Sequence, residues 1–375
     1  MKKFLPVCSP LLEGNELSYV TEAVSTGWIS SSGSYVTEFE KSFAAYCEVG
    51  HGIAVCNGTV ALHLALVALG VGPGDEVIIP NFTMAASAFA VCYTGAMPVF
   101  VDADKETWNM AIPSLESKIT PKTKAIMPVH IFGNPCDMTA LHRVSEKWGI
   151  PLLEDAAEAH GAEVNGKKVG SLGNLAAFSF FANKNVTTGE GGMVVTDDDA
   201  LAQACRYHKN LCFPLDAPRT YLHADIGFNY RMSNIHAALG LAQTERADYY
   251  RNLRIRHGCL YRELLEKIPG ITVQKDQLGG KNVFWMNGMC VCPEQYGRSR
   301  DELVAHLKEN GIETRLFFNG MHRQPALQKY GCDSSDTYPV SDFLADNGLY
   351  LPSGSGLAEE DIHFICDVIA SFRLD

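Results

Sequence analysis

Short apolar runs alternate with helix-length segments through the first two-thirds of the chain. The runs lie at 76–80, 98–102, 125–130, 151–155, 176–181 and 192–196. A polar loop that contains glycine, residues 182–191, separates the last two. Continuous apolar runs separated by helices are typical of a mainly parallel sheet that is covered on both faces. We therefore expect a large α/β domain over residues 1–245, including an N-terminal segment.

Helical patterns complete this interpretation. Segments 58–70 and 85–93 are predicted helices between the first strands, and a long helical segment from 234 to about 265 leads out of the large domain. The remaining pattern predicts a strand at 283–291, a helix at 299–310, a strand at 313–318 and a closing helix at 359–372. These elements indicate a small C-terminal α+β domain over residues 246–375.

One stretch, residues 77–101, carries no charged side chain and is long enough to cross a bilayer. Pro80, Asn81 and Pro98 interrupt it, so we interpret it as strand, helix and strand, and we predict no membrane span. The first residues lack the apolar run of a signal peptide. We therefore expect a cytoplasmic protein.

Charge and cysteine content narrow the function classes. Among 375 residues, 31 lysines and arginines face 43 aspartates and glutamates, a net charge of −12. This balance argues against non-specific binding of nucleic acid or anionic membranes, but it leaves room for a local basic pocket. The 12 cysteines are scattered through apolar segments without a Cys-x-x-Cys pair. We expect buried free thiols and no metal site.

Polar residues follow several predicted strands. Asp102, His130 and Asp155 stand at such ends, and ligands of parallel sheets collect beyond the carboxyl ends of the strands. This edge is therefore the candidate site. A histidine there is more commonly a hydrogen-bonded supporting group than a catalytic one, and we interpret His130 and His160 in that way.

Lys184 follows an apolar strand that contains Phe178 and Phe180. A loop lysine is by default a solvated surface group. Aromatic and small neighbours favour a desolvated position instead, where the pKa of the amine falls and the amine becomes nucleophilic, as Schiff-base chemistry requires. Asp155 is either a helix N-cap or the carboxylate that keeps a pyridine nitrogen protonated.

A third feature points to an anion. The sequence Cys-Asn-Gly-Thr at 56–59 opens a predicted helix, whose free backbone N–H groups and threonine hydroxyl suit a phosphate. A phosphate site, a buried carboxylate and a nucleophilic lysine, in this order along the chain, favour pyridoxal 5′-phosphate (PLP) as cofactor.

At these residues the chain resembles the DegT/DnrJ/EryC1/StrS sugar aminotransferases. The resemblance covers nearly the whole chain, through the segments 26–30, 57–59, 154–161, 178–180, 184, 188–192 and 227–232. It implies fold type I of the PLP-dependent transferases, the aspartate-aminotransferase-like fold. Within the family, the perosamine-forming subgroup is the most similar.

The resemblance also implies residue roles. Lys184 would bind the cofactor covalently and move the proton, and Asp155 would pair with the pyridine nitrogen. The positions implied for other cofactor contacts are Asn57, Gly58, Thr59, Met84, Glu158, Ser179 and Asn229. Asn229 would reach the partner subunit's phosphate site, which implies a homodimer with shared active sites that could pair into a tetramer. Glu158 could instead be an exposed helix acid.

Substrate contacts are expected from Trp28, Arg231 and His322, although Arg231 could be structural and His322 an ordinary loop histidine. Two positions differ from the family pattern. Met84 stands where a tyrosine or tryptophan commonly stacks on the pyridine ring, so we expect a less rigidly held cofactor. The segment 316–320 replaces a proline-rich run.

The function implied is amination of a nucleotide-linked 4-keto-6-deoxy sugar, best represented by GDP-4-keto-6-deoxymannose. Glutamate would be the amino donor, and pyridoxamine phosphate would form between the two half-reactions. UDP- and dTDP-linked sugars are alternatives. A dehydratase relative would carry histidine at position 184. A non-catalytic nucleotide-sugar-binding protein of the same fold is the alternative from another class.

Overall fold

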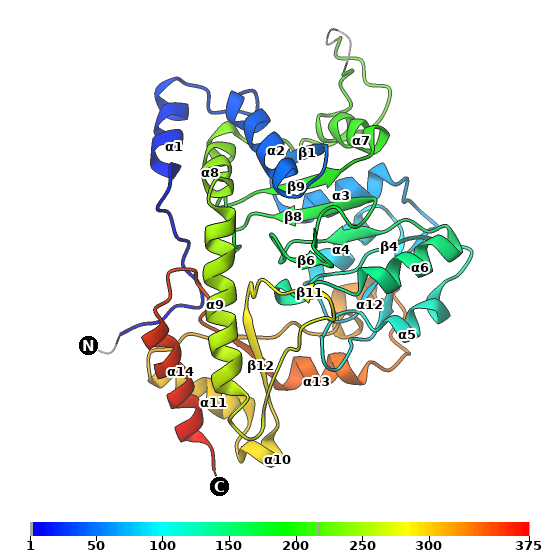
Figure 1. The fold of residues 1–375 in the computed structure, drawn as a ribbon. Coiled ribbons are helices and arrows are strands. Elements are labelled where there is room, and N and C mark those ends of the chain that lie inside the picture. The colour runs from blue at the N-terminus through cyan, green and yellow to red at the C-terminus, as the bar shows by residue number, and fades with distance from the viewer. Residues whose placement is uncertain (1–2, 216–217, 219, 375) are drawn as a thin grey trace.

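The computed structural model describes residues 3–215, 218 and 220–374 (Figure 1). The helices are α1 (Glu16–Ser25), α2 (Ser34–Tyr46), α3 (Gly58–Ala68), α4 (Ala85–Tyr93), α5 (Ile112–Leu115), α6 (Met138–Trp148), α7 (Asp199–Lys209), α8 (Asn234–Thr244), α9 (Ala247–Leu265), α10 (Pro293–Tyr296), α11 (Arg300–Glu309), α12 (Pro325–Tyr330), α13 (Pro339–Asn347) and α14 (Glu359–Phe372). The strands are β1 (His51–Val55), β2 (Glu76–Pro80), β3 (Met97–Val101), β4 (Thr123–Ile126), β5 (Leu153–Asp155), β6 (Glu163–Val164), β7 (Lys167–Lys168), β8 (Leu175–Ser179), β9 (Gly192–Thr196), β10 (Ile271–Val273), β11 (Gly280–Lys281), β12 (Asn287–Val291), β13 (Arg315–Leu316) and β14 (Gly348–Leu351).

The predicted apolar runs form one central sheet. Two groups of strands, β3-β2-β4 and β5-β8-β9-β1, meet where β4 and the residues after it pair in parallel with β5. The pairs β2–β3, β2–β4 and β5–β8 are parallel, whereas β9 runs antiparallel to both β8 and β1. The strand directions confirm the expected mainly parallel sheet. Strand β4 ends before Pro128, which has no N–H to donate to a neighbouring strand.

Both faces of this sheet are buried, which explains the continuous apolar runs. In β1, Ile53 and Val55 pack with apolar residues of α3 and α4. The intervening Ala54 faces the opposite layer, which contains Phe39 and Phe43 of α2. Because successive strand residues point to opposite faces, a strand between two helical layers needs apolar residues at every position.

The uncharged stretch from 77 to 101 forms most of β2, all of α4 and β3, as predicted (Figure 1). Among the residues that the structure describes, no helix is both long enough and apolar enough to cross a membrane.

The long connector is two helices rather than one. Helix α8 ends at Thr244 and α9 begins at Ala247, with the Arg246 backbone leaving helical geometry between them. The guanidinium of Arg246 donates to the carbonyl of Glu13 at 2.6 Å and lies 4.6 Å from the Tyr249 ring. These contacts fix the break at a point where neither proline nor glycine marks it.

A second sheet, in the order β10-β12-β14-β13, is antiparallel throughout. The strand expected at 283–291 begins only at Asn287, because Phe284 has a φ of 48° and its N–H donates to the side chain of Asn282 at 2.8 Å. The strand expected at 313–318 is shorter in the structure, where only β13 forms. The N-terminal segment joins this part of the chain, since Leu5 exchanges backbone hydrogen bonds with residues 311 and 313.

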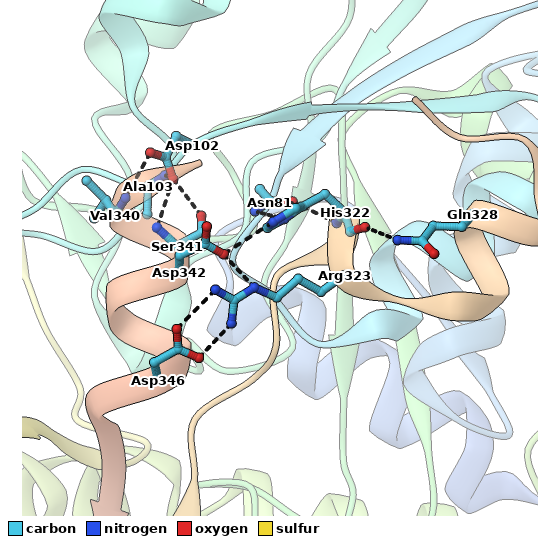
Figure 2. Close-up of polar contacts among 10 residues, drawn as sticks. All are labelled: Asn81, Asp102, Ala103, His322, Arg323, Gln328, Val340, Ser341, Asp342 and Asp346. Carbon is cyan, nitrogen blue, oxygen red and sulfur yellow. Dashed lines mark hydrogen bonds and ion pairs between the residues drawn. The ribbon is translucent and has the colours of Figure 1, made fainter. Parts of the chain in front are cut away.

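Asp102, directly after β3, connects the two parts of the chain (Figure 2). Its carboxylate accepts hydrogen bonds from the N–H of Val340 at 3.1 Å and from the N–H and hydroxyl of Ser341 at 2.9 and 2.6 Å. It therefore caps the N-terminus of α13, where free N–H groups favour a negative charge. The strand-end carboxylate expected to border a ligand site has a structural partner.

We expect Asp102→Ala to lower the free energy of unfolding by about 1–2 kcal/mol, because the N–H groups of α13 lose their acceptor. Chemical denaturation followed by circular dichroism measures the change. Asp367→Ala, an exposed position on α14, is the matched control and should shift the midpoint little. Equal midpoints for the two variants would contradict the capping role.

Candidate active site

A cavity of about 630 Å³ lies beyond the carboxyl edge of the central sheet, within the range of small-molecule sites. Eight predicted site residues line it: Asn57, Gly58, Thr59, Met84, Asp155, Glu158, Ser179 and Lys184. The structure therefore brings the predicted lysine, both carboxylates and the predicted phosphate loop into one cavity, although they span more than 120 residues of sequence.

The N-terminus of α3 forms one wall. Asn57 is the N-cap, and its side chain accepts a hydrogen bond from Val60 N–H at 3.0 Å. A Cβ atom on Gly58 would lie 2.6 Å from the Cβ of Ser179, and one on Gly192 would lie 2.3 Å from the carbonyl oxygen of Asn57. Both glycines are needed for the helix to approach β8 and β9 closely. The free N–H groups of α3 and the hydroxyls of Thr59 and Ser179 can bind an anion there.

Lys184 projects from the loop between β8 and β9. Its backbone N–H donates to Phe181 at 2.9 Å, and Thr188 N–H donates to the Phe180 carbonyl at 2.9 Å, so the loop is closed on itself. Burial lowers the pKa of the Lys184 amine, and the negative charges of Glu158 and Asp155 oppose this shift. The surface-lysine alternative does not fit, because Lys184 is partly buried and lines one cavity with two carboxylates.

Asp155 ends β5 and is 4% exposed. One carboxylate oxygen accepts from the Ser87 hydroxyl at 2.7 Å and the other from Ala157 N–H at 3.2 Å. Burial raises the pKa of Asp155, and these hydrogen bonds with the nearby Lys184 lower it. The residues after it form turns rather than the helix that an N-cap would require.

Glu158 is buried, not an exposed helix acid. Its carboxylate accepts a hydrogen bond from the N–H of Phe132 at 2.8 Å. Burial raises its pKa to about 7, against the opposing effect of the Lys184 charge. Near neutral pH this carboxyl group can therefore donate or accept a proton.

Met84, the N-cap of α4, lines the cavity and is 52% exposed. Its sulfur accepts a weak hydrogen bond from Ala86 N–H at 3.4 Å. The side chain thus lies at the cavity surface, as a group stacking on a bound ring must.

The cavity residues that were not predicted include Ser87, Trp285, Phe318 and Tyr350. Ser87 lies on the predicted helix at 85–93, and its position three residues after the Met84 N-cap could have suggested that it faces the same site. The other three come from the C-terminal part of the chain. Their local sequence carries no sign of a role at the central sheet.

Four predicted residues lie outside this cavity: Trp28, Asn229, Arg231 and His322. Trp28 is 59% exposed. Asn229 and Arg231 flank Tyr230, whose carbonyl accepts from the N–H of Cys56 just before α3. The Arg231 guanidinium donates to Asn210 at 2.8 Å and lines a separate depression with Arg206 and Lys209.

His322 belongs to a polar network (Figure 2). Its ring lies 2.9 Å from the Asn81 amide through Nδ1 and 3.2 Å from Asp342 through Nε2. Asp342 also pairs with Arg323, which pairs in turn with Asp346. Asn81 is two residues from Thr83, a cavity residue, so the network fixes a segment beside the site.

His130 is a hydrogen-bonded supporting group, as interpreted, whereas the ring nitrogens of His160 have no hydrogen-bond partner among the described residues. His130 is fully buried and lies 3.0 Å from the Glu154 carboxylate through Nε2, while its Nδ1 accepts from Cys136 N–H. His160 packs against the rings of Phe43, Phe178 and Phe180, and burial lowers its pKa to about 3.

Metal and disulfide chemistry find no site in the part of the chain that the structure describes. No group of three or more histidine, cysteine or acidic side chains there could hold a metal ion. The 12 cysteines are free thiols; seven are buried as expected, four are half-buried and Cys259 is exposed.

Comparisons with known proteins agree with the family resemblance of the sequence. Residues 10–370 match the model of the DegT/DnrJ/EryC1/StrS aminotransferase family. The chain is 47% identical over 359 residues to the GDP-perosamine synthase of Caulobacter vibrioides, covering 96% of this chain and 95% of that protein. It is 42% identical to the GDP-perosamine synthase of Escherichia coli O157:H7 over the full length of both.

Among solved structures, 3-amino-5-hydroxybenzoic acid synthase superposes with a TM-score of 0.92 at 33% identity and covers 99% of both chains. The match extends over the central sheet, the second sheet and the cavity between them. The chain belongs to the DegT/DnrJ/EryC1/StrS aminotransferase family.

Proposed function

We propose that the protein is a PLP-dependent aminotransferase that converts GDP-4-keto-6-deoxymannose to the 4-amino sugar, with glutamate as the amino donor. The observation that carries this proposal is the Lys184 amine in one cavity with Asp155 and the N-terminus of α3. The substrate rests on the two GDP-perosamine synthases that match the chain almost end to end. The same chemistry on a UDP- or dTDP-linked sugar is the alternative that the experiment must separate.

The cavity fits PLP. Because Gly58 has no side chain, the N-terminus of α3 lies directly against Ser179, and its N–H groups and the hydroxyls of Thr59 and Ser179 can hold a phosphate beside Asn57. We assign Asp155 to the pyridine nitrogen, Glu158 to the phenolic oxygen and Met84 to the ring face. When bound, PLP supplies an aldehyde that condenses with amines and a ring that accepts electrons from a cleaved C–H bond.

We assign separate steps of the reaction to Lys184, Asp155 and Ser87. Lys184 attacks as a neutral amine, which its desolvation favours, and its Nζ later moves the proton released from the donor carbon. The buried carboxylate of Asp155 keeps a proton on the ring nitrogen, and Ser87 orients that carboxylate. Low polarity strengthens both interactions because little water competes for them.

We also propose a homodimer, with or without pairing into tetramers. Asn229 is exposed outside this cavity and is the neighbour of Tyr230, which hydrogen-bonds Cys56 ahead of α3; this supports the assignment of Asn229 to the phosphate site of a second copy. The division at 245/246 falls in the break between α8 and α9, which supports the proposed large and small domains. We assign Trp28, Arg231 and His322 to substrate binding. All three lie outside this cavity.

Product formation tests the substrate. Purified protein with PLP and glutamate should convert GDP-4-keto-6-deoxymannose to a product in which an amine replaces the keto oxygen, detected by mass spectrometry. UDP- and dTDP-linked 4-keto sugars are the comparison substrates. Preferred turnover of one of those would reassign the nucleotide. Failure of all three, with no PLP bound, would favour the non-catalytic binding protein.

Lys184→Ala should abolish both turnover and the visible absorbance of the PLP-loaded protein, because the covalent link to the cofactor is lost. Lys41→Ala, at an exposed position on α2, is the control and should retain both. Wild-type turnover in the Lys184 variant would refute the assignment of the lysine.

Ser87→Ala should weaken PLP binding at low pH. The Ser87 hydroxyl lowers the pKa of Asp155, so its removal raises that pKa further, and the carboxylate is protonated at a higher pH. Because affinity requires the ionised form, the pH below which the dissociation constant rises should move up.

Titration of the apoprotein with PLP across pH measures this shift. Ser87→Thr keeps the hydroxyl and should restore the wild-type profile. Identical profiles for the alanine variant and the wild type would show that Ser87 does not control Asp155.

A further inference from the structure

The amine of Lys184 lies against the indole ring of Trp285. The Nζ of Lys184 lies over the indole ring, 3.5 Å from its centroid. Among the described residues, the amine makes no hydrogen bond and no ion pair within 4 Å, although Asp155 and Glu158 line the same cavity. The π face of Trp285 is therefore the direct contact of this amine.

The ring itself is held in place. Trp285 is 4% exposed, and its indole N–H donates to the carbonyl of Asn183, the residue before Lys184, at 3.0 Å. Its own carbonyl accepts from Arg254 at 3.0 Å. Arg254 is 2% exposed and donates also to the Ser355 hydroxyl at 2.9 Å. The indole ring of Trp285 and the loop that carries Lys184 are thus hydrogen-bonded to each other, and Arg254 links them to α9.

We infer that Trp285 is a positioning residue that docks the ε-amine of Lys184 whenever this amine is not covalently bonded to the cofactor. The inference rests on the proposed function, because it assigns a role within the same reaction. An ammonium over an indole face is attracted by the π electrons, more strongly when desolvated, and indole provides the strongest such face among the side chains. The docked amine stays within the cavity, where a flexible lysine would otherwise sample several rotamers.

This docking has a consequence for protonation. The π face stabilises the ammonium and not the neutral amine, so it holds back deprotonation. Other groups act on the same amine: Asp155 and Glu158 from β5 and the turn after it, Cys8 from the N-terminal segment, and His160 and Arg254 nearby. A test must therefore change the π face alone and leave these groups and the cavity shape unchanged.

Fluorinated tryptophans make that change, because fluorine withdraws charge from the π face while the ring size and the indole N–H are kept. The protein is produced with tryptophan, monofluoro-, difluoro- or trifluorotryptophan, and the apoprotein is mixed with PLP at a series of pH values. The rate of appearance of visible absorbance reports covalent capture by the neutral amine. The midpoint of the rate against pH gives the apparent pKa of Lys184.

We expect this midpoint to fall stepwise with fluorination, by about one unit over the series, which corresponds to about tenfold faster capture below the midpoint. Trp285→Phe is the matched control, since fluorination then affects only Trp28, Trp108 and Trp148. Its midpoint should not depend on fluorination. Far-ultraviolet circular dichroism verifies that each protein is folded.

A midpoint that does not change in the wild type, or that changes equally in Trp285→Phe, would overturn the inference and leave the proposed function intact. Wild-type apoprotein that captures no PLP at all would overturn the proposed function, and the inference with it.

Discussion

The removal of the Lys184 amine from water is the constraint to which the rest of the site responds. Burial alone would favour a neutral amine, while Asp155 and Glu158 favour the ammonium. The same burial raises the pKa of both carboxyl groups. Three groups whose charges depend on one another therefore occupy one cavity, and small changes in the distance between them move protons among them. Precise packing around the cavity is needed to hold this balance, and α3, β8 and the indole of Trp285 provide it.

Much of this arrangement could be predicted from local sequence. Apolar runs located the strands because a strand covered on both faces has no polar position, as Ile53, Ala54 and Val55 illustrate. The helix at 85–93 and the closing helix at 359–372 have the predicted limits. Asp155 and Lys184 came together because both follow central strands of one sheet, and the carboxyl ends of parallel strands share an edge.

Other features depend on contacts that local patterns do not encode. Tyr350 of β14 reaches the cavity from the second sheet, and Trp285 and Phe318 reach it from segments next to β12 and β13; nothing adjacent to them in sequence points there. Strand β12 starts late because Phe284 has a positive φ. The apolar sequence around Phe284 does not indicate this conformation. Asp102 satisfied the pattern of a strand-end ligand residue, yet α13 uses its carboxylate. A strand-end acid can serve either purpose, and only the packing of a distant helix decides between them.

The antiparallel direction of β9 limits how far the backbone around Lys184 can move. A parallel neighbour would require a crossover through the whole thickness of the domain, usually by way of a helix. Because β9 returns alongside β8, residues 180–191 leave and re-enter the sheet at the same rim, anchored on both sides within a short span. A loop anchored at both ends in this way allows little movement of its backbone. In the proposed reaction, Lys184 would therefore leave and regain the cofactor by rotation of its four-carbon side chain, while the backbone stays in place.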